Sequence, residues 1–174
     1  MEEDSVLVLV LDALDVDEDG LSFSAESDTS SVVVGVDNTE LTLTPAPDWN
    51  GTANIMVTVS DGFLSDSVYF ALTVTPVNDS PTIDLPESVS FAEDGSLVED
   101  FSEFVDDIDE DLLTLTVSDT VNITASIDVF TVTFGAVQDY NGTETLTFTI
   151  NDSQGRAIAS DEIDVTVAPV NDAP

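Results

Sequence analysis

The strongest constraint on the fold is an internal repeat, because four short motifs occur twice in the same order at offsets of 90 to 93 residues. The paired motifs begin at Glu3 and Glu93 (Glu-Asp), at Asp15 and Asp107 (Asp-x-Asp-Glu-Asp), at Asp48 and Asp139 (Asp-aromatic-Asn-Gly-Thr), and at Pro76 and Pro169 (Pro-Val-Asn-Asp-x-Pro). A fixed period of this kind indicates tandem structural units. We therefore expect two domains, residues 1–79 and residues 80–174. We expect the first copy to be shortened at its N-terminal end, and the second to end in the linker to a third domain of a longer parent protein.

Within each copy, apolar and polar residues alternate with a period of two. The clearest runs are residues 21–25, 40–44 and 55–60 in the first copy and residues 113–117, 130–134 and 146–150 in the second. Val, Leu, Ile or Phe alternating with Thr or Ser is typical of strands with one buried face, and the Asp-Gly and Asn-Gly steps between runs predict turns. The pattern predicts an all-β chain of two tandem antiparallel β-sandwich domains with Greek-key connections. Residues 101–105 are the one place where we expect a helical turn.

The composition excludes most kinds of catalysis and several kinds of partner. The chain has 37 Asp and Glu residues against one basic residue, Arg156, and it lacks His, Lys and Cys, so its net charge is −36. Without His or Cys there is no Ser-His-Asp or Cys-His nucleophile and no disulfide framework. One Arg cannot neutralise phosphates, which excludes nucleic acid and anionic lipid surfaces as partners. The opening apolar run, Val6 to Leu11, is too short to span a bilayer, so we expect no membrane insertion.

The acidic motifs predict calcium sites. Alternate carboxylates in a tight loop bring several oxygens to one side, and Ca²⁺ requires six to eight such ligands. The first copy also satisfies the EF-hand loop pattern, from Asp15 to Glu26. Its flanks alternate like strands, however, and the second copy has Leu112 in place of the required Gly, so we do not expect an EF-hand. A solvated acidic strand end is the alternative interpretation of each motif.

Two further motifs have more than one interpretation. The Pro-Val-Asn-Asp segment is stiff because of its prolines, and its Asn and Asp either cap a turn or serve as oxygen ligands between domains. The aromatic residues Trp49 and Tyr140 invite a sugar-stacking hypothesis, but aromatics at the corners of β-sandwiches usually pack on the core, and we expect that here.

Taken together, these motifs resemble the cadherin-like repeat of large bacterial surface proteins, a unit of roughly 95 residues. The resemblance covers both copies and implies cadherin-like/Ig-like domains with Ca²⁺ held between successive repeats. It implies ligands at the junction of the two copies from Glu3, Asp48, Asn50, Asn78, Asp79, Asp107, Asp109, Asp111 and Asp152. It implies half-sites toward a preceding repeat from Asp15, Asp17, Asp19 and Asp61, and toward a following repeat from Glu93, Asp139, Asn141, Asn171 and Asp172. The Asp15–Asp19 loop is also expected to hold an ion by itself.

Some positions depart from the family's motifs. The family's Asp-x-Glu corresponds to Asp48-Trp49-Asn50, and its longer linker motif has Pro76 and Ser80 at two ligand positions. These changes imply fewer ions or weaker binding.

The sequence thus favours a non-enzymatic, calcium-rigidified spacer or adhesion module of an extracellular bacterial protein. Its expected partners are neighbouring repeats of the same chain, and protein or polysaccharide at the cell surface. The main alternative is a carbohydrate-binding accessory module of a secreted polysaccharide-degrading enzyme. A two-carboxylate glycosidase is chemically open but has no marked acid and base pair. General adaptation to high salt would also explain the acidity and is compatible with a spacer.

Overall fold

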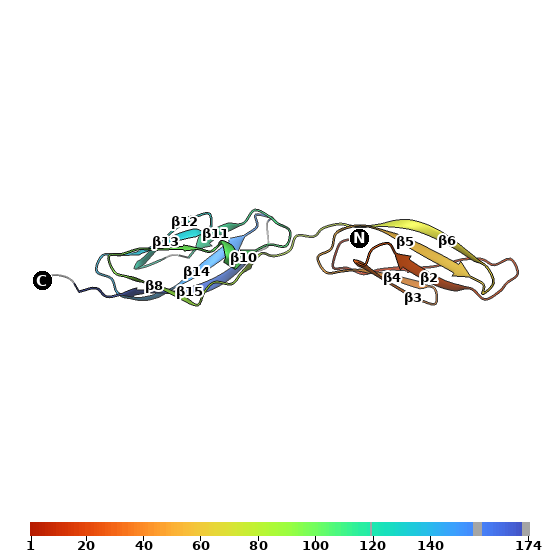
Figure 1. The fold of residues 1–174 in the computed structure, drawn as a ribbon, viewed down its shortest axis with the longest axis horizontal. Coiled ribbons are helices and arrows are strands. Elements are labelled where there is room, and N and C mark those ends of the chain that lie inside the picture. The colour runs from red at the N-terminus through yellow and green to blue at the C-terminus, as the bar shows by residue number, and fades with distance from the viewer. Residues whose placement is uncertain (119, 155–157, 172–174) are drawn as a thin grey trace. The chain divides into compact units, whose positions relative to one another are not determined.

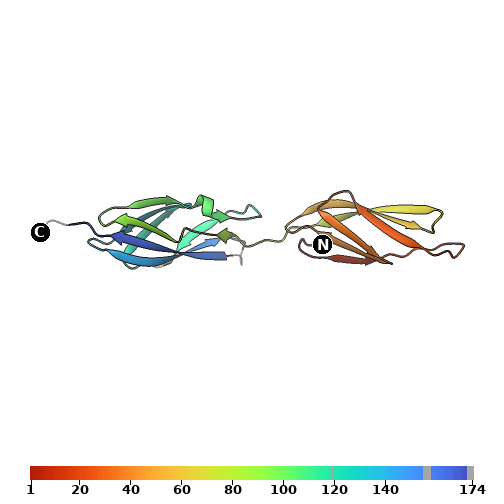
Figure 2. The ribbon, with the colours of Figure 1, turned by 60° about the horizontal axis from the view of Figure 1, so that its bottom comes forward.

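The computed structural model describes residues 1–118, 120–154 and 158–171. The chain divides into two compact units, Met1–Val77 and Asn78–Pro174, which we call unit 1 and unit 2 and describe separately. Each unit is built from strands in two layers (Figures 1 and 2). In the described part of the chain, no helix is both long enough and apolar enough to cross a membrane.

Unit 1 is a sandwich of two three-stranded sheets. One sheet has the order β1-β4-β3 and the other the order β2-β5-β6, all antiparallel. The strands are β1 (Leu7–Val10), β2 (Ser22–Ser27), β3 (Val32–Asp37), β4 (Glu40–Pro45), β5 (Gly51–Ser60) and β6 (Ser65–Val74). Their inward positions form one core, because alternate residues of each strand face the opposite sheet. The buried members are Val32, Leu41, Leu43, Ala53, Ile55, Val57, Leu72 and Val74.

Unit 2 repeats this plan with additional elements. Its strands are β7 (Thr82–Ile83), β8 (Ser88–Ala92), β9 (Leu97–Asp100), β10 (Val105–Asp106), β11 (Thr114–Val117), β12 (Ile123–Asp128), β13 (Thr131–Ala136), β14 (Gly142–Asn151) and β15 (Ile158–Ala168). A four-stranded sheet, β11-β14-β15-β8, lies against a three-stranded sheet, β12-β13-β9, and β7 pairs with β10. The rings of Phe101, Phe134 and Phe148 meet edge to face in the core.

The predicted all-β fold and the predicted helical turn are both confirmed. The turn is the 3₁₀ helix η1 (Ser102–Phe104), which directly follows the buried Phe101. One pairing differs from a purely antiparallel sandwich, because β8 runs parallel to β15. Unit 1 has an isolated counterpart of this pairing, the parallel bridge between Glu2 and Thr75.

The aromatic residue of the third motif packs on the core in both units, as expected. Trp49 and Tyr140 are half-buried and contact the cores of unit 1 and unit 2. Each ring lies over the glycine two residues later, where a Cβ would come within 3.0 Å of the Trp49 ring or 2.8 Å of the Tyr140 hydroxyl. Gly51 and Gly142 also have φ of 152° and 153°, a conformation that other residues rarely adopt.

Candidate metal centre

The acidic loop between β10 and β11 of unit 2 gathers three carboxylates. Asp107 Oδ1 accepts hydrogen bonds from the backbone N–H groups of Asp109 (3.0 Å) and Asp111 (3.3 Å), which folds the loop around its first residue. Asp107, Asp109 and Asp111 each offer an oxygen within 4.8 Å of the others. Asp107 Oδ2 is buried and has no hydrogen-bond partner among the described residues. A buried carboxylate oxygen beside two further carboxylates is costly unless a cation compensates it.

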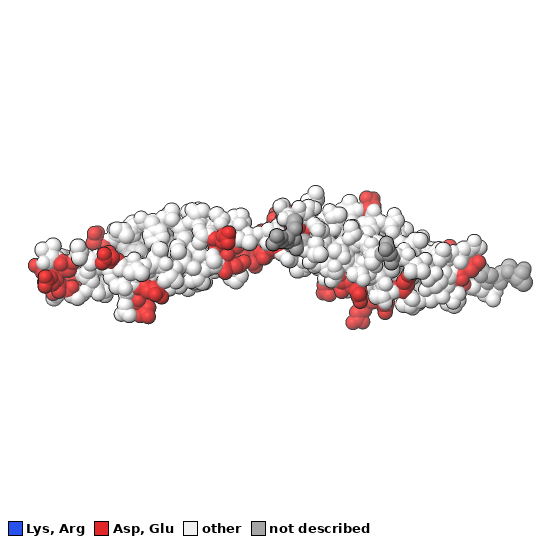
Figure 3. Space-filling model, turned by 180° about the vertical axis from the view of Figure 1, so that it is seen from behind, with Lys and Arg blue, Asp and Glu red and all other residues white. Residues whose placement is uncertain are grey.

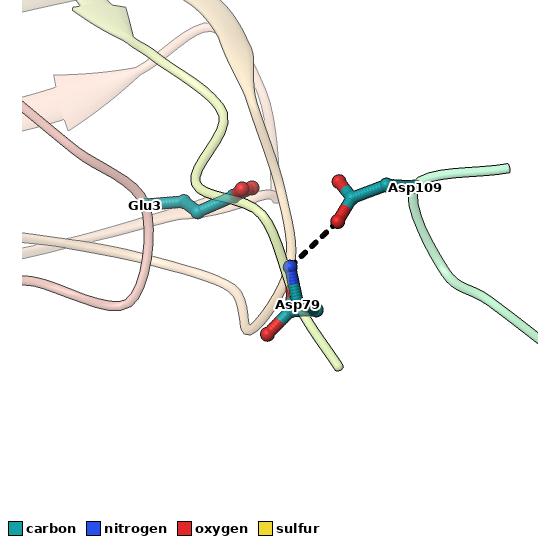
Figure 4. Close-up of side chains that lie close together, drawn as sticks. All are labelled: Glu3, Asp79 and Asp109. Carbon is teal, nitrogen blue, oxygen red and sulfur yellow. Dashed lines mark hydrogen bonds between the residues drawn. The ribbon is translucent and has the colours of Figure 1, made fainter. Parts of the chain in front are cut away.

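Two residues at the start of unit 2 bind to the same end of this unit. The side chain of Asn78 donates to Asp152 Oδ2 at 2.8 Å, and the backbone N–H of Asp79 donates to Asp109 Oδ2 at 2.7 Å (Figure 4). Asp79 and Asp109 also bring carboxylate oxygens within 4.8 Å of each other. The linker motif therefore contacts the acidic loop through the backbone N–H of Asp79, and it contacts Asp152 through the side chain of Asn78.

Asp152 completes this group from the hairpin between β14 and β15. It is 2% exposed, and hydrogen bonds from the Asn78 side chain and the Gln154 N–H lower its pKa, so it stays charged. Gln154 also donates its side-chain amide to Asp111 Oδ1 at 3.2 Å, which connects the hairpin with the acidic loop. One end of unit 2 thus carries six of the predicted ligands: Asn78, Asp79, Asp107, Asp109, Asp111 and Asp152.

The corresponding loop of unit 1 has the same backbone pattern but a looser carboxylate group. Asp15 Oδ1 accepts from the N–H groups of Asp17 (2.9 Å) and Asp19 (3.0 Å). Among the described residues, however, these three do not form a set of oxygens within 4.8 Å. Asp15 and Asp61 line one shallow hollow of about 240 Å³, and N–H groups of Leu64 and Phe63 lower the pKa of Asp61. Strands β1 and β2, not helices, flank the loop, consistent with the rejection of an EF-hand.

The Glu-Asp motifs lie at the end of each unit that is opposite to its acidic loop. Glu3 and Glu93 are 3% and 6% exposed, and Oε1 of each accepts the backbone N–H of the Val in the following Pro-Val-Asn-Asp motif, Val77 or Val170. The side chains of Asn50 and Asn141 donate to the other oxygen of the same glutamates, both at 3.4 Å. In unit 1, Asp4 Oδ1 also accepts the N–H of Asp48, and the two carboxylates come within 4.8 Å of each other.

The remaining predicted ligands are placed as follows. Asp139, like its counterpart Asp48, has a positive φ in the turn before the glycine. Asn171 is exposed, and Asp172 lies outside the described residues, as does Arg156. Two contributors were not predicted, Asp4 and Gln154. The sequence could have indicated Asp4, because this residue belongs to a repeated motif. It could not have indicated Gln154 in the same way, because the first copy has no matching Gln.

The acidic side chains are not spread evenly over the surface. On the face shown in Figure 3, acidic side chains gather in clusters with broad uncharged areas between them. The possible ligand atoms at this end of unit 2 are carboxylate and amide oxygens, which suit hard cations such as Ca²⁺ and Mg²⁺. The unpartnered oxygen of Asp107 and the donor set therefore both fit a hard divalent cation.

Comparisons with known proteins agree with the fold. Residues 1–75 match the family model described as a cadherin-like domain, and residues 78–168 match the one described as a bacterial Ig domain. Human protocadherin-24 EC1-2 has a TM-score of 0.62 at 15% identity, over 93% of this chain and 88% of that chain. Drosophila N-cadherin EC1-4 has a TM-score of 0.61 at 18% identity, over 98% and 46%.

Two other comparisons carry no information about function. An endo-fucoidan hydrolase of glycoside hydrolase family 107 matches at 19% identity with a TM-score of 0.40, and this chain spans 27% of its length. That score is too low to support an argument about function. No curated protein sequence matches the chain.

Proposed function

The chain belongs to the bacterial Ig domain family, with a cadherin-like domain preceding the Ig domain, and from this membership we propose that it is a calcium-rigidified spacer or adhesion module of a large extracellular protein. Domains of these families usually lie outside the cell and are typically non-catalytic. The absence of His and Cys leaves this chain few catalytic groups.

The observation that carries the calcium proposal is the environment of Asp107. Its Oδ2 is buried without a hydrogen-bond partner in the described structure, and the oxygens of Asp109 and Asp111 lie within 4.8 Å. Repulsion among three carboxylates destabilises this loop unless a cation is present. We propose that Ca²⁺ is held by Asp107, Asp109, Asp111 and Asp152, with Asn78 and Asp79 contributing from the linker.

Chain continuity extends the proposal across the linker. Three consecutive residues are each bound by a different acidic side chain: Val77 by Glu3, Asn78 by Asp152 and Asp79 by Asp109. Because these residues are covalently linked, a cation that orders the linker restrains the segment joining the two units. We therefore propose that Glu3, Asp48 and Asn50 also belong to the junction site, and that Asp15–Asp19 with Asp61, and Glu93 with Asp139, Asn141, Asn171 and Asp172, form half-sites toward neighbouring repeats.

Calcium binding stabilises the folded state by mass action. A ligand at 100 times its dissociation constant contributes about 2.7 kcal/mol to the free energy of unfolding, provided that it does not bind the unfolded chain. The same binding energy restricts motion at the linker, so the proposed work of the module is mechanical: it stiffens the chain and presents a more distant binding domain.

The test is thermal unfolding of the calcium-free chain during titration with CaCl₂, compared with MgCl₂ and with KCl at equal ionic strength. We expect a saturable rise in the unfolding midpoint of unit 2 with Ca²⁺ that the other salts do not match. Asp107→Asn should abolish most of this rise, whereas Asp128→Asn removes an exposed carboxylate of the same unit and should preserve it. A Ca²⁺ effect equal to that of ionic strength would overturn the proposal and favour general salt adaptation.

The carbohydrate-binding alternative has one favourable observation. Tyr69 on β6 is 71% exposed and available for stacking, whereas Trp49 and Tyr140 pack on their own cores. Affinity electrophoresis in polysaccharide gels tests it, with Tyr69→Ala as the control variant. Retardation of the parent chain but not of Tyr69→Ala would support this alternative.

A further inference from the structure

The acidic loop of unit 2 borders a hollow whose apolar lining the calcium proposal does not use. The hollow, which we call the unit 2 hollow, measures about 330 Å³ and is formed by η1, the acidic loop and the hairpin between β12 and β13. Its lining includes the carboxylates of Asp106, Asp107, Glu110 and Asp111 and the apolar side chains of Val105, Leu112, Leu113, Val129 and Phe130. A metal ion coordinates the oxygens alone, so the apolar lining requires another explanation.

Two sequence differences between the copies shape the hollow beside the acidic loop. Six residues, 101–106, separate β9 from Asp107 and include η1, whereas four residues, 11–14, separate β1 from Asp15. Leu112 follows the last Asp of the loop, where the first copy has Gly, and its side chain is 85% exposed. Unit 2 therefore has a helical turn and a large apolar side chain at places where unit 1 has neither.

The hairpin between β12 and β13 supplies a further part of the apolar lining through a strained residue. Its two turn residues are Val129 and Phe130, and those of the matching hairpin in unit 1 are Asn38 and Thr39. Val129 has φ of 57° and Asn38 has φ of 54°, a left-handed conformation that Asn tolerates and β-branched residues rarely adopt. Val129 is 71% exposed, so packing in the core does not explain the choice of Val. Backbone strain of this kind is concentrated at functional positions.

The carboxylates of the hollow have no compensating positive charge among the described side chains, none of which is basic. The buried Oδ2 of Asp107 also has no hydrogen-bond partner in the described structure. Four carboxylates around one hollow repel one another and attract a cation. The apolar lining favours a cation that carries a hydrocarbon part, because apolar surface gains free energy when another apolar group removes it from water.

We propose that the unit 2 hollow binds a primary ammonium group on a short apolar stem, which is the chemistry of a small alkylamine and of the lysine side chain of another protein. The ammonium group is attracted by the four carboxylates, and the stem covers Leu112 and Val129. The volume of about 330 Å³ lies at the lower end of the range of small-ligand pockets and suits a stem of about four to six carbons. The proposal does not rest on calcium, although calcium bound at Asp107 and Asp111 would compete with the ammonium group.

The test is a titration of the full, ¹⁵N-labelled chain with hexylammonium chloride, in chelator and at constant ionic strength, followed by backbone amide chemical shifts. We expect saturable shifts at Leu112, Leu113 and Val129, with a dissociation constant on the order of 1 mM. Gly20 and Asn38, in the matching loops of unit 1, are internal controls and should not respond. An equal response in both units would show general attraction of cations to an acidic chain and would overturn the proposal.

Two control ligands each lack one half of the proposed ligand. Ammonium chloride has the charge without the stem, and hexan-1-ol has the stem without the charge, so each should bind about tenfold more weakly or worse than hexylammonium. Hexylammonium that binds no more tightly than either control would overturn the proposal. Lysine capped with acetyl and methylamide groups distinguishes the two sources: binding equal to that of hexylammonium supports a protein side chain, and much weaker binding supports a free amine.

The chain offers matched variants of the hollow. Val129→Asn introduces the residue that unit 1 has at the same φ, so it should fold, and it should weaken hexylammonium binding about fivefold. Val121→Asn is the control, because Val121 is 81% exposed in the same unit and does not line the hollow. Binding to Val129→Asn as tight as to the parent chain would overturn the proposal.

A second variant separates this proposal from the calcium proposal. Glu110→Gln removes a carboxylate that lines the hollow but is not among the proposed calcium ligands. It should weaken hexylammonium binding about threefold and leave the rise of the unfolding midpoint with Ca²⁺ unchanged. Hexylammonium binding without any Ca²⁺ effect would overturn the calcium proposal alone, and a Ca²⁺ effect without hexylammonium binding in chelator would overturn this one alone.

Discussion

Glu144 orders the chain before β12 by accepting three backbone hydrogen bonds. The N–H groups of Val121, Asn122 and Ile123 point at its carboxylate, at 2.7, 3.1 and 2.8 Å. Burial works to raise its pKa, but the three N–H groups together lower it below the usual value of 4.5. A charged acceptor for several backbone donors is stronger than a neutral one.

Glu144→Ala is therefore expected to destabilise unit 2 by about 1–3 kcal/mol, because three donors lose their partner. The pH dependence has a defined sign. Since the folded pKa lies below the unfolded one, the contribution of Glu144 is full above about pH 4.5 and is lost as the pH falls through the folded pKa. Denaturant unfolding at pH 7 and at acidic pH measures both effects. A variant as stable as the parent at pH 7, or a loss no larger than that of Asp128→Ala, would contradict this account.

The turn that precedes β5 depends on a glycine covered by an aromatic ring. Gly51 has φ of 152°, and a Cβ there would lie 3.0 Å from Trp49 Cζ2. Unit 2 repeats both properties at Gly142 and Tyr140, so the Asp-aromatic-Asn-Gly motif specifies a backbone geometry as well as a set of oxygens.

Gly51→Ala should destabilise unit 1 by about 1–3 kcal/mol, through strain at this φ and displacement of the Trp49 ring. Gly20→Ala is the matched control, since nothing lies within 4 Å of its added Cβ, and it should be close to neutral. Thermal unfolding followed by circular dichroism compares the two. Equal midpoints for both variants would show that the ring and the φ do not constrain this turn.

Local alternation was enough to predict six of the fifteen strands that the described residues form. The six runs identified in the sequence correspond to β2, β4 and β5 in unit 1 and to β11, β13 and β14 in unit 2. The parallel direction of β8 was not predictable, because Ser88–Ala92 alternates like the other strands and alternation does not encode direction. The two-residue strands β7 and β10 are too short to show a period.

The candidate site was predictable in its residues but not in its geometry. Repetition marked Asp107, Asp109 and Asp111, and the structure groups them. The same motif in unit 1 does not form such a group among the described residues, although the hydrogen bonds from Asp15 are alike. That difference depends on side-chain directions and on neighbours such as Gln154, which a motif does not contain.

At the scale of the whole molecule, the net charge of −36 makes the acidic side chains repel one another. The chain has only one basic side chain to offset this repulsion. Repulsion of this kind falls with ionic strength, whereas a specific site saturates at its own stoichiometry. The two effects are therefore separable in one molecule. We expect general screening of charge and specific ion binding to act together at the linker, where Asn78 and Asp79 are bound to carboxylates of unit 2.

We predict that Ca²⁺ narrows the distribution of distances between the two units. Because the chain lacks Cys, spin labels can be placed uniquely by Val33→Cys on β3 and Val98→Cys on β9, where both side chains are largely exposed. Double electron–electron resonance should give a broad distribution in chelator and a narrower one with Ca²⁺, because bound ions restrain the linker. The Asp107→Asn background serves as the control and should remain broad. A width that Ca²⁺ does not change would contradict rigidification even if calcium stabilises unit 2.

The position of Trp49 provides an optical probe that requires no label. It is the chain's only tryptophan, it belongs to unit 1, and its counterpart in unit 2 is Tyr140. Red-edge excitation is absorbed by indole and not by phenol, so the emission reports unit 1 alone. Circular dichroism reports both units together, and the difference between the two signals resolves the order in which the units unfold. Since Trp49 stands between Asp48 and Asn50, its emission also reports changes in the surroundings of these two side chains.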